Sequence, residues 1–75
     1  MTKITVYGSD QCPPCRSLKQ FLKNKGISFE YIDVTKDERG TKKLVEKNIF
    51  SIPVIEIGDK TIIGFNKEEL NKLIS

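Results

Sequence analysis

Residues 3–25, KITVYGSDQCPPCRSLKQFLKNK, place two cysteines between the pattern of a short buried strand and that of an amphipathic helix. The strand is expected at Lys3–Tyr7, and the helix starts at the cysteines and continues to Lys25. Cys12 and Cys15 are the chain's two cysteines and form a C-x-x-C motif. At a helix start they face free backbone N–H groups and the positive end of the helix dipole, which favour thiolate over thiol. This stretch therefore predicts a redox-active dithiol.

The composition is that of a small globular domain. The chain has 75 residues, of which 37% are hydrophobic and 31% are charged, so we expect a single domain over residues 1–75 with one small core. Its apolar runs are too short to cross a bilayer, and its N-terminal residues lack the apolar stretch of a signal peptide. We therefore expect a cytoplasmic protein with no membrane partner. We also expect it to be a monomer.

The charge pattern argues against nucleic-acid binding. The formal net charge is +3 at pH 7, and the basic residues are spread along the chain. A nucleic-acid partner would require basic residues clustered on one face with aromatic residues between them. Solvated helix faces account for the lysines instead, so no nucleic-acid partner is expected.

Three further segments have the composition of strands. β-branched and aromatic residues dominate them, and turn-forming residues bound them. They are Ser28–Asp33, Val54–Ile57 and Thr61–Ile63. Gly58-Asp59 separates the last two and predicts a tight hairpin turn.

Two further helices are predicted from capping patterns. Thr35 and Glu38 form a T-x-x-E capping box, so a helix should start there and run to about Asn48, with Gly40 as a weak point. The residues that bury it are expected to be Leu44 and Val45. The last helix should be capped by Asn66 and anchored by Leu70, Leu73 and Ile74.

These elements follow one another in the order β-α-β-α-β-β-α. The first two strands are joined through a helix, so they should be parallel with a right-handed crossover. The last two strands form an antiparallel hairpin, and the third strand pairs with the first. The prediction is an α/β fold with a four-stranded mixed sheet and helices on both faces.

The order of the elements and three motifs resemble a glutaredoxin-like protein of the thioredoxin fold, over the whole chain. The motifs are the C-x-x-C after the first strand, Ile52-Pro53 before the third strand, and Ile63-Gly64-Phe65 before the last helix. Gly64-Phe65-Asn66 followed by Leu70 is also similar to the C-terminal segment of the NrdH-type redoxins, a branch that reduces ribonucleotide reductase. The resemblance implies a dithiol–disulfide oxidoreductase that reduces protein disulfides, with ribonucleotide reductase or a peroxidase as candidate substrates.

The resemblance also implies substrate-binding roles outside the C-x-x-C. In thioredoxin-like folds the peptide bond before the proline that corresponds to Pro53 is cis and lies beside the dithiol. The backbone of Ile52 would then pair with an extended substrate segment. Gly64 and Phe65 would lie nearby, with part of the Phe65 ring exposed. From the residues alone, a trans proline at the start of a strand and a core position for Phe65 remain alternatives.

The helix start assigns different roles to the two cysteines. If Cys12 is the N-cap residue, its sulfur faces the free helix amides and is the exposed nucleophile. Cys15 is then tucked into the first turn as the resolving thiol. The chain has no histidine, so backbone amides, the helix dipole and a Lys or Arg side chain must stabilise the thiolate.

Two prolines between the cysteines bear on the redox potential. Pro13 at the first helical position is favourable. Pro14 at the second position has no N–H, which leaves the Cys15 amide as the one donor for the Cys12 sulfur. A less stabilised thiolate makes the couple more reducing. We therefore expect a potential nearer the thioredoxin value of about −270 mV than the glutaredoxin range of about −200 to −230 mV.

A C-x-x-C motif also occurs in metal sites and in static disulfides. Zinc needs four ligands, which two cysteines and no histidine supply only across a dimer. An iron–sulfur cluster would likewise bridge a dimer, and a structural disulfide would close too short a loop to stabilise the fold much. We expect no bound metal or cofactor, only the redox-active Cys12-Cys15 disulfide. A dimeric cluster carrier remains an alternative.

The source of electrons is the other open question. Glutathione-using glutaredoxins carry a basic residue three positions before the first cysteine, a Tyr at the position of Pro14 and an acidic pair after the glycine that corresponds to Gly64. This chain has Ser9, Pro14 and Asn66-Lys67 there, and Lys67 would repel the glutathione ammonium. We therefore expect a flavoprotein of the thioredoxin-reductase kind as the donor, with a glutathione-dependent glutaredoxin as the alternative. The chain also lacks the tryptophan and the Arg-Pro-Asp that flank this glycine segment in NrdH-type redoxins.

Overall fold

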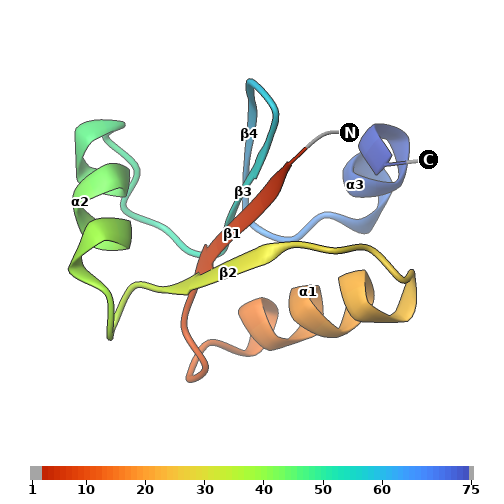
Figure 1. The fold of residues 1–75 in the computed structure, drawn as a ribbon, viewed down its shortest axis with the longest axis horizontal. Helices are drawn as coiled ribbons and strands as arrows, with labels where there is room; N and C mark the ends of the chain where they lie inside the picture. Colours follow the sequence, from red (N-terminus) through yellow and green to blue (C-terminus); the bar gives the residue numbers. More distant parts are fainter. Residues whose placement is uncertain (1–2, 75) are drawn as a thin grey trace.

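The structure is a computed structural model, and it describes residues 3–74. Its elements are β1 (Ile4–Gly8), α1 (Pro13–Asn24), β2 (Glu30–Asp33), α2 (Glu38–Glu46), β3 (Val54–Ile57), β4 (Lys60–Ile63) and α3 (Lys67–Ile74). Figure 1 shows them in chain order from red to blue. The predicted order β-α-β-α-β-β-α is confirmed.

The strands form one four-stranded sheet in the order β2-β1-β3-β4. β1 runs parallel to β2, with Val6 opposite Tyr31, and antiparallel to β3, with Val6 opposite Ile55. β3 and β4 form the antiparallel hairpin, with Ile55 opposite Ile62. The predicted mixed sheet and its pairings are confirmed, and α1 supplies the crossover that two parallel strands require.

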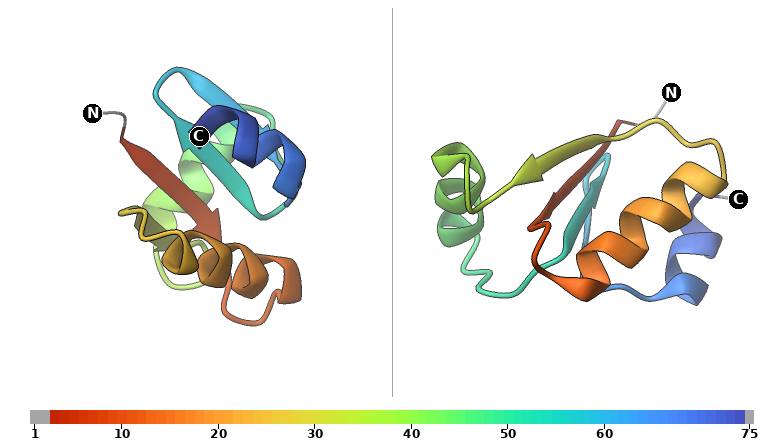
Figure 2. Two further views of the ribbon diagram at one scale, coloured as in Figure 1. Left: turned by 90° about the vertical axis from the view of Figure 1, so that its right-hand side faces the viewer. Right: turned by 90° about the horizontal axis from the view of Figure 1, so that it is seen from below.

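Helices cover both faces of the sheet. Figure 2 shows α1 and α3 together on one face and α2 alone on the other. Because side chains alternate along a strand, β1 directs Val6 into the core under α1 and α3, and Tyr7 toward α2. All 5 residues of β1 are buried, since this strand has neighbours on both sides and helices on both faces.

The larger part of the core lies between the sheet and the two helices α1 and α3. Its buried residues come from these helices and from β1, β3 and β4: Ile4, Val6, Leu18, Leu22, Ile55, Ile57, Ile62 and Leu70. The smaller part lies under α2 and contains Tyr7, Leu44 and Val54. Helix α1, which carries the cysteines, is therefore held on the more extensively packed face.

The middle helix starts later than its sequence pattern predicts. Its N-cap is Asp37, whose carboxylate accepts the Arg39 N–H at 3.0 Å, so the predicted capping box at Thr35 is wrong. Thr35 instead donates its N–H at 2.9 Å and its hydroxyl at 2.5 Å to Asp33 Oδ1. The turn after β2 thus uses the hydroxyl that a Thr35 cap would need.

The end of α2 and its buried face also differ from the prediction. The helix ends at Glu46, and Asn48 follows in the left-handed region with φ at 58°, which stops a helix. Leu44 is buried as predicted, but the predicted burial of Val45 is wrong, since its side chain is 51% exposed. Successive side chains point about 100° apart around a helix. Because α2 packs against the sheet on one side only, Leu44 faces the sheet and Val45 faces away from it.

Gly40 allows α2 to approach the sheet. The residue is buried, and a Cβ built on it would lie 2.7 Å from Ile32 Cγ2 and 3.1 Å from Val34 Cγ1. A side chain at this point would overpack the interface. The weak point expected from helix propensity is therefore a position where packing requires a glycine.

The other element ends shift by one or two residues, as helix and strand ends commonly do. β1 is Ile4–Gly8 instead of Lys3–Tyr7, β2 starts at Glu30, and β4 starts at Lys60. α1 ends at Asn24. These shifts leave the order and the pairing of the elements unchanged.

The last helix begins as predicted. Asn66 Oδ1 accepts the Glu69 N–H at 3.2 Å, Leu70 is fully buried, and Leu73 packs partly buried against the larger core. The predicted anchoring by Ile74 concerns a side chain outside the described part of the chain. Within residues 3–74, no helix has the length and apolar character needed to cross a membrane.

Candidate active site

The dithiol lies in the loop and first helical turn after β1. Cys12 is the N-cap residue of α1, and Pro13 and Pro14 are its first two helical residues, as predicted. Two backbone hydrogen bonds hold Cys12: its N–H donates to Ser9 O, and its carbonyl accepts from Arg16 N, both at 3.1 Å. The backbone thus positions Cys12 without help from its side chain.

The two thiols differ in their exposure. Cys12 is partly exposed, whereas Cys15 is fully buried. The Cys12 side chain makes no capping hydrogen bond to the described backbone, so the one amide that Pro14 leaves available is not engaged by the neutral thiol. Of the two sulfur atoms, the accessible one therefore belongs to Cys12.

Burial also controls the protonation of Cys15. Burial raises the pKa of Cys15 to about 11, and a hydrogen bond with Cys12 adds to this effect, whereas the Ser9 backbone N–H acts in the opposite direction. At neutral pH Cys15 is therefore held as a neutral thiol. The pair combines one accessible sulfur with one sheltered, protonated sulfur.

Gly8, the last residue of β1, leaves space for Cys15. A Cβ at Gly8 would lie 2.9 Å from Cys15 Sγ and 3.0 Å from Tyr31 Oη, closer than packed atoms come. Sequence reasoning did not place Gly8 or Tyr31 at the site. The available signal was a glycine at the end of an otherwise β-branched and aromatic strand.

The Ile52-Pro53 segment leads into β3 beside the start of α1. Its peptide bond is cis, which is the isomer that the family resemblance implies. Pro53 is buried and Ile52 is partly buried. The Pro53 carbonyl accepts the Gly64 N–H at 2.7 Å, and this bond connects the proline segment with the Gly64-Phe65 segment.

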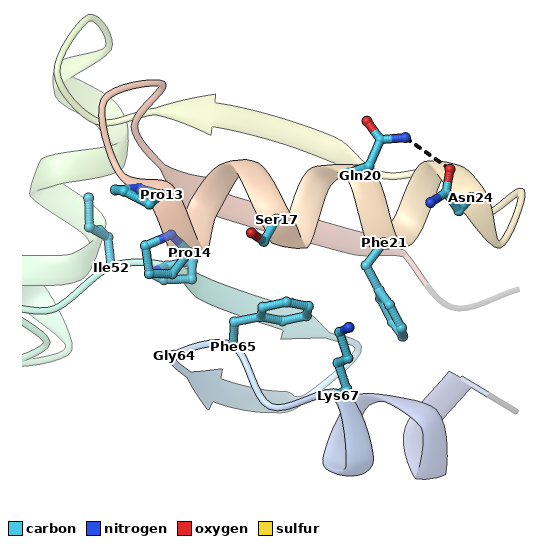
Figure 3. A pocket seen from close by; sticks show the side chains of 11 residues that line it. Pro13, Pro14, Ser17, Gln20, Phe21, Asn24, Ile52, Gly64, Phe65 and Lys67 are labelled. Atoms are coloured by element: carbon cyan, nitrogen blue, oxygen red, sulfur yellow. Dashed lines mark hydrogen bonds between the residues drawn. The ribbon is translucent and has the colours of Figure 1, made fainter.

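A groove of about 820 Å³ runs along α1 from the dithiol end of the helix, as Figure 3 shows. Its lining comes from α1, from the proline segment and from the segment that leads into α3. The lining residues are Pro13, Pro14, Ser17, Gln20, Phe21, Asn24, Ile52, Pro53, Gly64, Phe65 and Lys67. The groove therefore brings together the predicted residues other than the cysteines, which adjoin it through Pro13 and Pro14.

Two aromatic rings and one charge give the groove its character. Phe65 is partly buried, and its ring meets the Phe21 ring edge to face, with centroids 5.7 Å apart. Figure 3 shows the Phe65 ring and the Lys67 ammonium group facing the same space below α1. Lys67 is the one charged residue among those that line the groove.

The groove also includes α1 residues that sequence reasoning missed. Ser17, Gln20, Phe21 and Asn24 continue the helix face that starts at Pro14. Their spacing of three and four residues places them on one side of the helix. That spacing was the signal available, but the polar members of the set also suit a solvated face.

A metal ion would need more ligands than this site provides. The part of the chain that the structure describes contains no group of three or more His, Cys, Asp or Glu side chains placed to hold one. Zinc is bound by four ligands in structural sites. The two cysteines would therefore need ligands from a second chain.

Comparisons with known proteins identify the family. The family model described as glutaredoxin matches residues 4–62. A glutaredoxin-like 8.6 kDa protein from the rubredoxin operon of Clostridium pasteurianum is 40% identical over 73 residues, covering 95% of this chain and 96% of that protein. The glutaredoxin-like protein NrdH of Escherichia coli K12 is 30% identical over 71 residues, covering 95% of this chain and 88% of that protein.

Solved structures agree with this assignment. The NrdH-redoxin of Escherichia coli superimposes with a TM-score of 0.87 at 29% identity, covering 97% of this chain and 96% of that one. The thioredoxin-like protein BC3987 gives a TM-score of 0.88 at 36% identity, covering 96% of this chain and 100% of that one. The chain thus has the thioredoxin-like fold, and it belongs to the glutaredoxin family as an NrdH-type redoxin with the role of a thiol–disulfide oxidoreductase.

Proposed function

We propose that this protein reduces disulfides in other proteins through Cys12 as nucleophile and Cys15 as resolving thiol. The observation that carries the proposal is the asymmetry of the pair, in which Cys12 is partly exposed at the helix start and Cys15 is fully buried. Thiol–disulfide exchange needs an accessible attacking sulfur and a second thiol that is close but does not compete for the substrate.

The proposed reaction has two exchange steps. The Cys12 thiolate attacks one sulfur of the substrate disulfide, and the substrate S–S bond breaks as the mixed disulfide forms. Cys15 then loses its proton and attacks the Cys12 sulfur, which forms the Cys12-Cys15 disulfide and releases the second substrate sulfur as a thiolate. Each released thiolate takes up a proton, and two electrons have passed to the substrate. The internal disulfide is the redox group, with no bound cofactor.

The groove beside the dithiol is the proposed substrate site. Pro13, Pro14 and Phe65 provide apolar contacts, and Ile52 lines the same groove. An extended segment that carries a disulfide would lie along the groove, pairing with the Ile52 backbone and passing Gly64. Ribonucleotide reductase and a peroxidase are the candidate substrates.

A flavoprotein of the thioredoxin-reductase kind is the proposed electron donor. Lys67 is the one charged lining residue, and its ammonium would repel the amino group of glutathione. Ser9, where a basic glutathione contact is expected, is 4% exposed and its hydroxyl accepts the Gln11 N–H at 3.2 Å. The Escherichia coli NrdH-redoxin is described with a thioredoxin-like activity profile, which supports the same choice.

Trapping tests the two cysteine roles. Cys15→Ser should leave the substrate attached to Cys12 as a stable mixed disulfide, whereas Cys12→Ser should abolish insulin reduction. Alkylation of the reduced protein followed by peptide mass spectrometry should find Cys12 labelled first. Faster labelling of Cys15, or a mixed disulfide on Cys15 in wild-type protein, would overturn the assignment.

A paired turnover assay tests the donor. Insulin reduction with a thioredoxin reductase and NADPH should exceed the rate with glutathione, glutathione reductase and NADPH. Lys67→Asp serves as a matched variant, because it removes the repulsion and should raise the glutathione-dependent rate selectively. Equal or higher wild-type rates with glutathione would contradict the flavoprotein proposal. A brown protein with stoichiometric iron would favour the cluster-carrier alternative.

A further inference from the structure

The Tyr31 hydroxyl is a buried polar group that the proposed reaction does not yet use. Its oxygen is buried and has no hydrogen-bond partner among the described residues. A buried hydroxyl without a partner destabilises a fold, and such groups are rare in native structures. An exception beside a redox site points to a partner that exists in another state of that site.

Tyr31 and Cys15 converge on a single point. Tyr31 lies on β2 opposite Val6, on the sheet face that α1 covers. A Cβ built on Gly8 would lie 2.9 Å from Cys15 Sγ and 3.0 Å from Tyr31 Oη. Both atoms are therefore within 3.0 Å of one point, and their separation is at most twice that distance. Gly8 places no side chain between them.

We propose that the Tyr31 hydroxyl donates a hydrogen bond to the Cys15 thiolate and so acts as a positioning residue for the resolving step. The inference rests on the proposed function of Cys15. In the dithiol form the buried sulfur is a neutral thiol and a poor acceptor. Once its proton leaves, the sulfur is an anion, and the hydroxyl is free to turn toward it.

The surroundings of Tyr31 keep it a donor. Burial raises the pKa of Tyr31 to about 12, so the hydroxyl retains its proton during turnover. The neighbouring groups that act in the same direction are Cys15, Asp10, Asp33 and Cys12. The Lys19 ammonium lies 4.2 Å from the Tyr31 ring centroid and 3.3 Å from Asp10 Oδ1. This cation–π contact helps to hold the Tyr31 ring, and with it the hydroxyl, in place beside Cys15.

The affected step is the resolution of the mixed disulfide. The Cys15 thiolate attacks the Cys12 sulfur, the Cys12-Cys15 bond forms, and the bond from Cys12 to the substrate sulfur breaks. The substrate leaves as a thiolate and takes up a proton equivalent to the one that Cys15 lost. Tyr31 keeps its own proton throughout, and acts by raising the fraction of Cys15 that is present as thiolate.

The size of the effect follows from two opposing terms. Loss of a hydrogen bond to a charged acceptor should lower the thiolate fraction of Cys15 about tenfold. A more basic thiolate is also a better nucleophile, with a Brønsted slope of about 0.4–0.5. The net expectation for Tyr31→Phe is a resolving step about threefold to fourfold slower.

Stopped-flow reaction of the reduced protein with 5,5′-dithiobis(2-nitrobenzoate) separates the two exchange steps. The first release of the coloured thiolate reports attack by Cys12, and the second reports resolution by Cys15. Tyr31→Phe should leave the first phase unchanged, slow the second, and displace the pH profile of the second phase to higher pH. Its free energy of unfolding should be equal to or above that of wild type, because the unpaired hydroxyl is gone.

Tyr7→Phe is the matched control, since it removes a hydroxyl on the opposite face of the sheet, where Tyr7 donates to Glu56 Oε1 at 2.8 Å. Its second phase should equal that of wild type. Superimposed second-phase rates and pH profiles in wild type and Tyr31→Phe would overturn the inference, whatever the stability of the variant. A wild-type protein without a second phase would instead contradict the proposed function, so the two failures are distinguishable.

Discussion

Tyr7 and Tyr31 lie on opposite faces of the same sheet, and their hydroxyl groups have opposite hydrogen-bonding states. On the α2 face, Tyr7 donates to Glu56 Oε1 at 2.8 Å, and the same carboxylate is paired with Lys43 and Lys47. On the α1 face, the Tyr31 hydroxyl is buried without a partner among the described residues. One face satisfies its polar groups within the resting fold, and the other leaves a donor unpaired beside the buried sulfur.

The polar contacts on the α2 face stabilise the fold, whereas the unpaired hydroxyl on the α1 face is available for the proposed reaction. The polar cluster of Tyr7, Lys43, Lys47 and Glu56 attaches α2 to β1 and β3 without touching the dithiol. The unpaired hydroxyl of Tyr31 contributes nothing comparable to the resting state, because its proposed partner is an anion that forms only during turnover. Sites that serve a reaction commonly give up some stability in this way. Substitutions on the two faces should therefore have different consequences.

The largest expected effect is on the acid stability that Glu56 provides. Burial raises the pKa of Glu56, but hydrogen bonds from Lys47, Tyr7 and Lys43 outweigh burial and lower the pKa from 4.5 to about 2. Stabilisation from a lowered pKa is present above the unfolded value and is lost as the pH falls toward the folded one. Glu56 should therefore account for about 2 kcal/mol of the unfolding free energy that wild type loses between pH 5 and pH 2, and Glu56→Gln should lack this part of the loss.

Urea unfolding across that pH window measures the effect. The estimate lies below the full shift because both lysines are partly exposed and screened. Glu46→Gln, at the exposed end of α2, is the matched control and should follow wild type. Parallel stability curves for wild type and Glu56→Gln would show that the α2 face does not depend on this carboxylate.

A second prediction compares the two hydroxyls directly. Tyr7→Phe removes a hydrogen bond to a charged acceptor and should lower the free energy of unfolding at pH 7 by about 1.5 kcal/mol. Tyr31→Phe removes an unpaired group and should cause no loss. Chemical denaturation of both variants provides the measurement. Equal losses would mean that the Tyr7 and Tyr31 hydroxyls are equally well paired in the folded state, which would contradict the difference between the two faces.

The smallest predicted effect is on the dithiol side and concerns the redox potential. Pro14→Ser restores an N–H at the second helical position, where it can bind a Cys12 thiolate. One such hydrogen bond contributes about 1.4 kcal/mol at the lower end of its range, which makes the disulfide more oxidising by about 30 mV. Equilibration with a dithiothreitol redox buffer measures the potential.

Pro13→Ser is the matched control for this prediction, because the first helical N–H is not the one that an N-cap side chain binds. Its potential should stay within a few millivolts of wild type. An unchanged potential in Pro14→Ser would mean that the helix amides do not reach the Cys12 sulfur, in line with the absent capping bond of the thiol form.

Local patterns predicted the elements best where a single segment contained the whole signal. Neighbouring residues were enough to predict three features: the succession of β1, the C-x-x-C motif and α1, the parallel crossover, and the Asn66 cap. The start of α2 was not, because Thr35 and Asp37 are both plausible N-caps, and Thr35 binds Asp33 instead of capping the helix. When two residues close in sequence can both cap a helix, the path of the chain out of β2 determines which of them does so.

The site was predictable to the extent that it is local. Spacing and the chemistry of each side chain were enough to identify the dithiol, the two prolines that follow Cys12 at a helix start, and the donor that Pro14 removes. Only the packing of the folded chain shows that Gly8 leaves room for Cys15, that Tyr31 reaches the same point from β2, and that a face of α1 completes the groove with Phe65 and Lys67. These contacts join strands and helices that are distant in the chain, and no local pattern specifies how closely packed elements bring their side chains together.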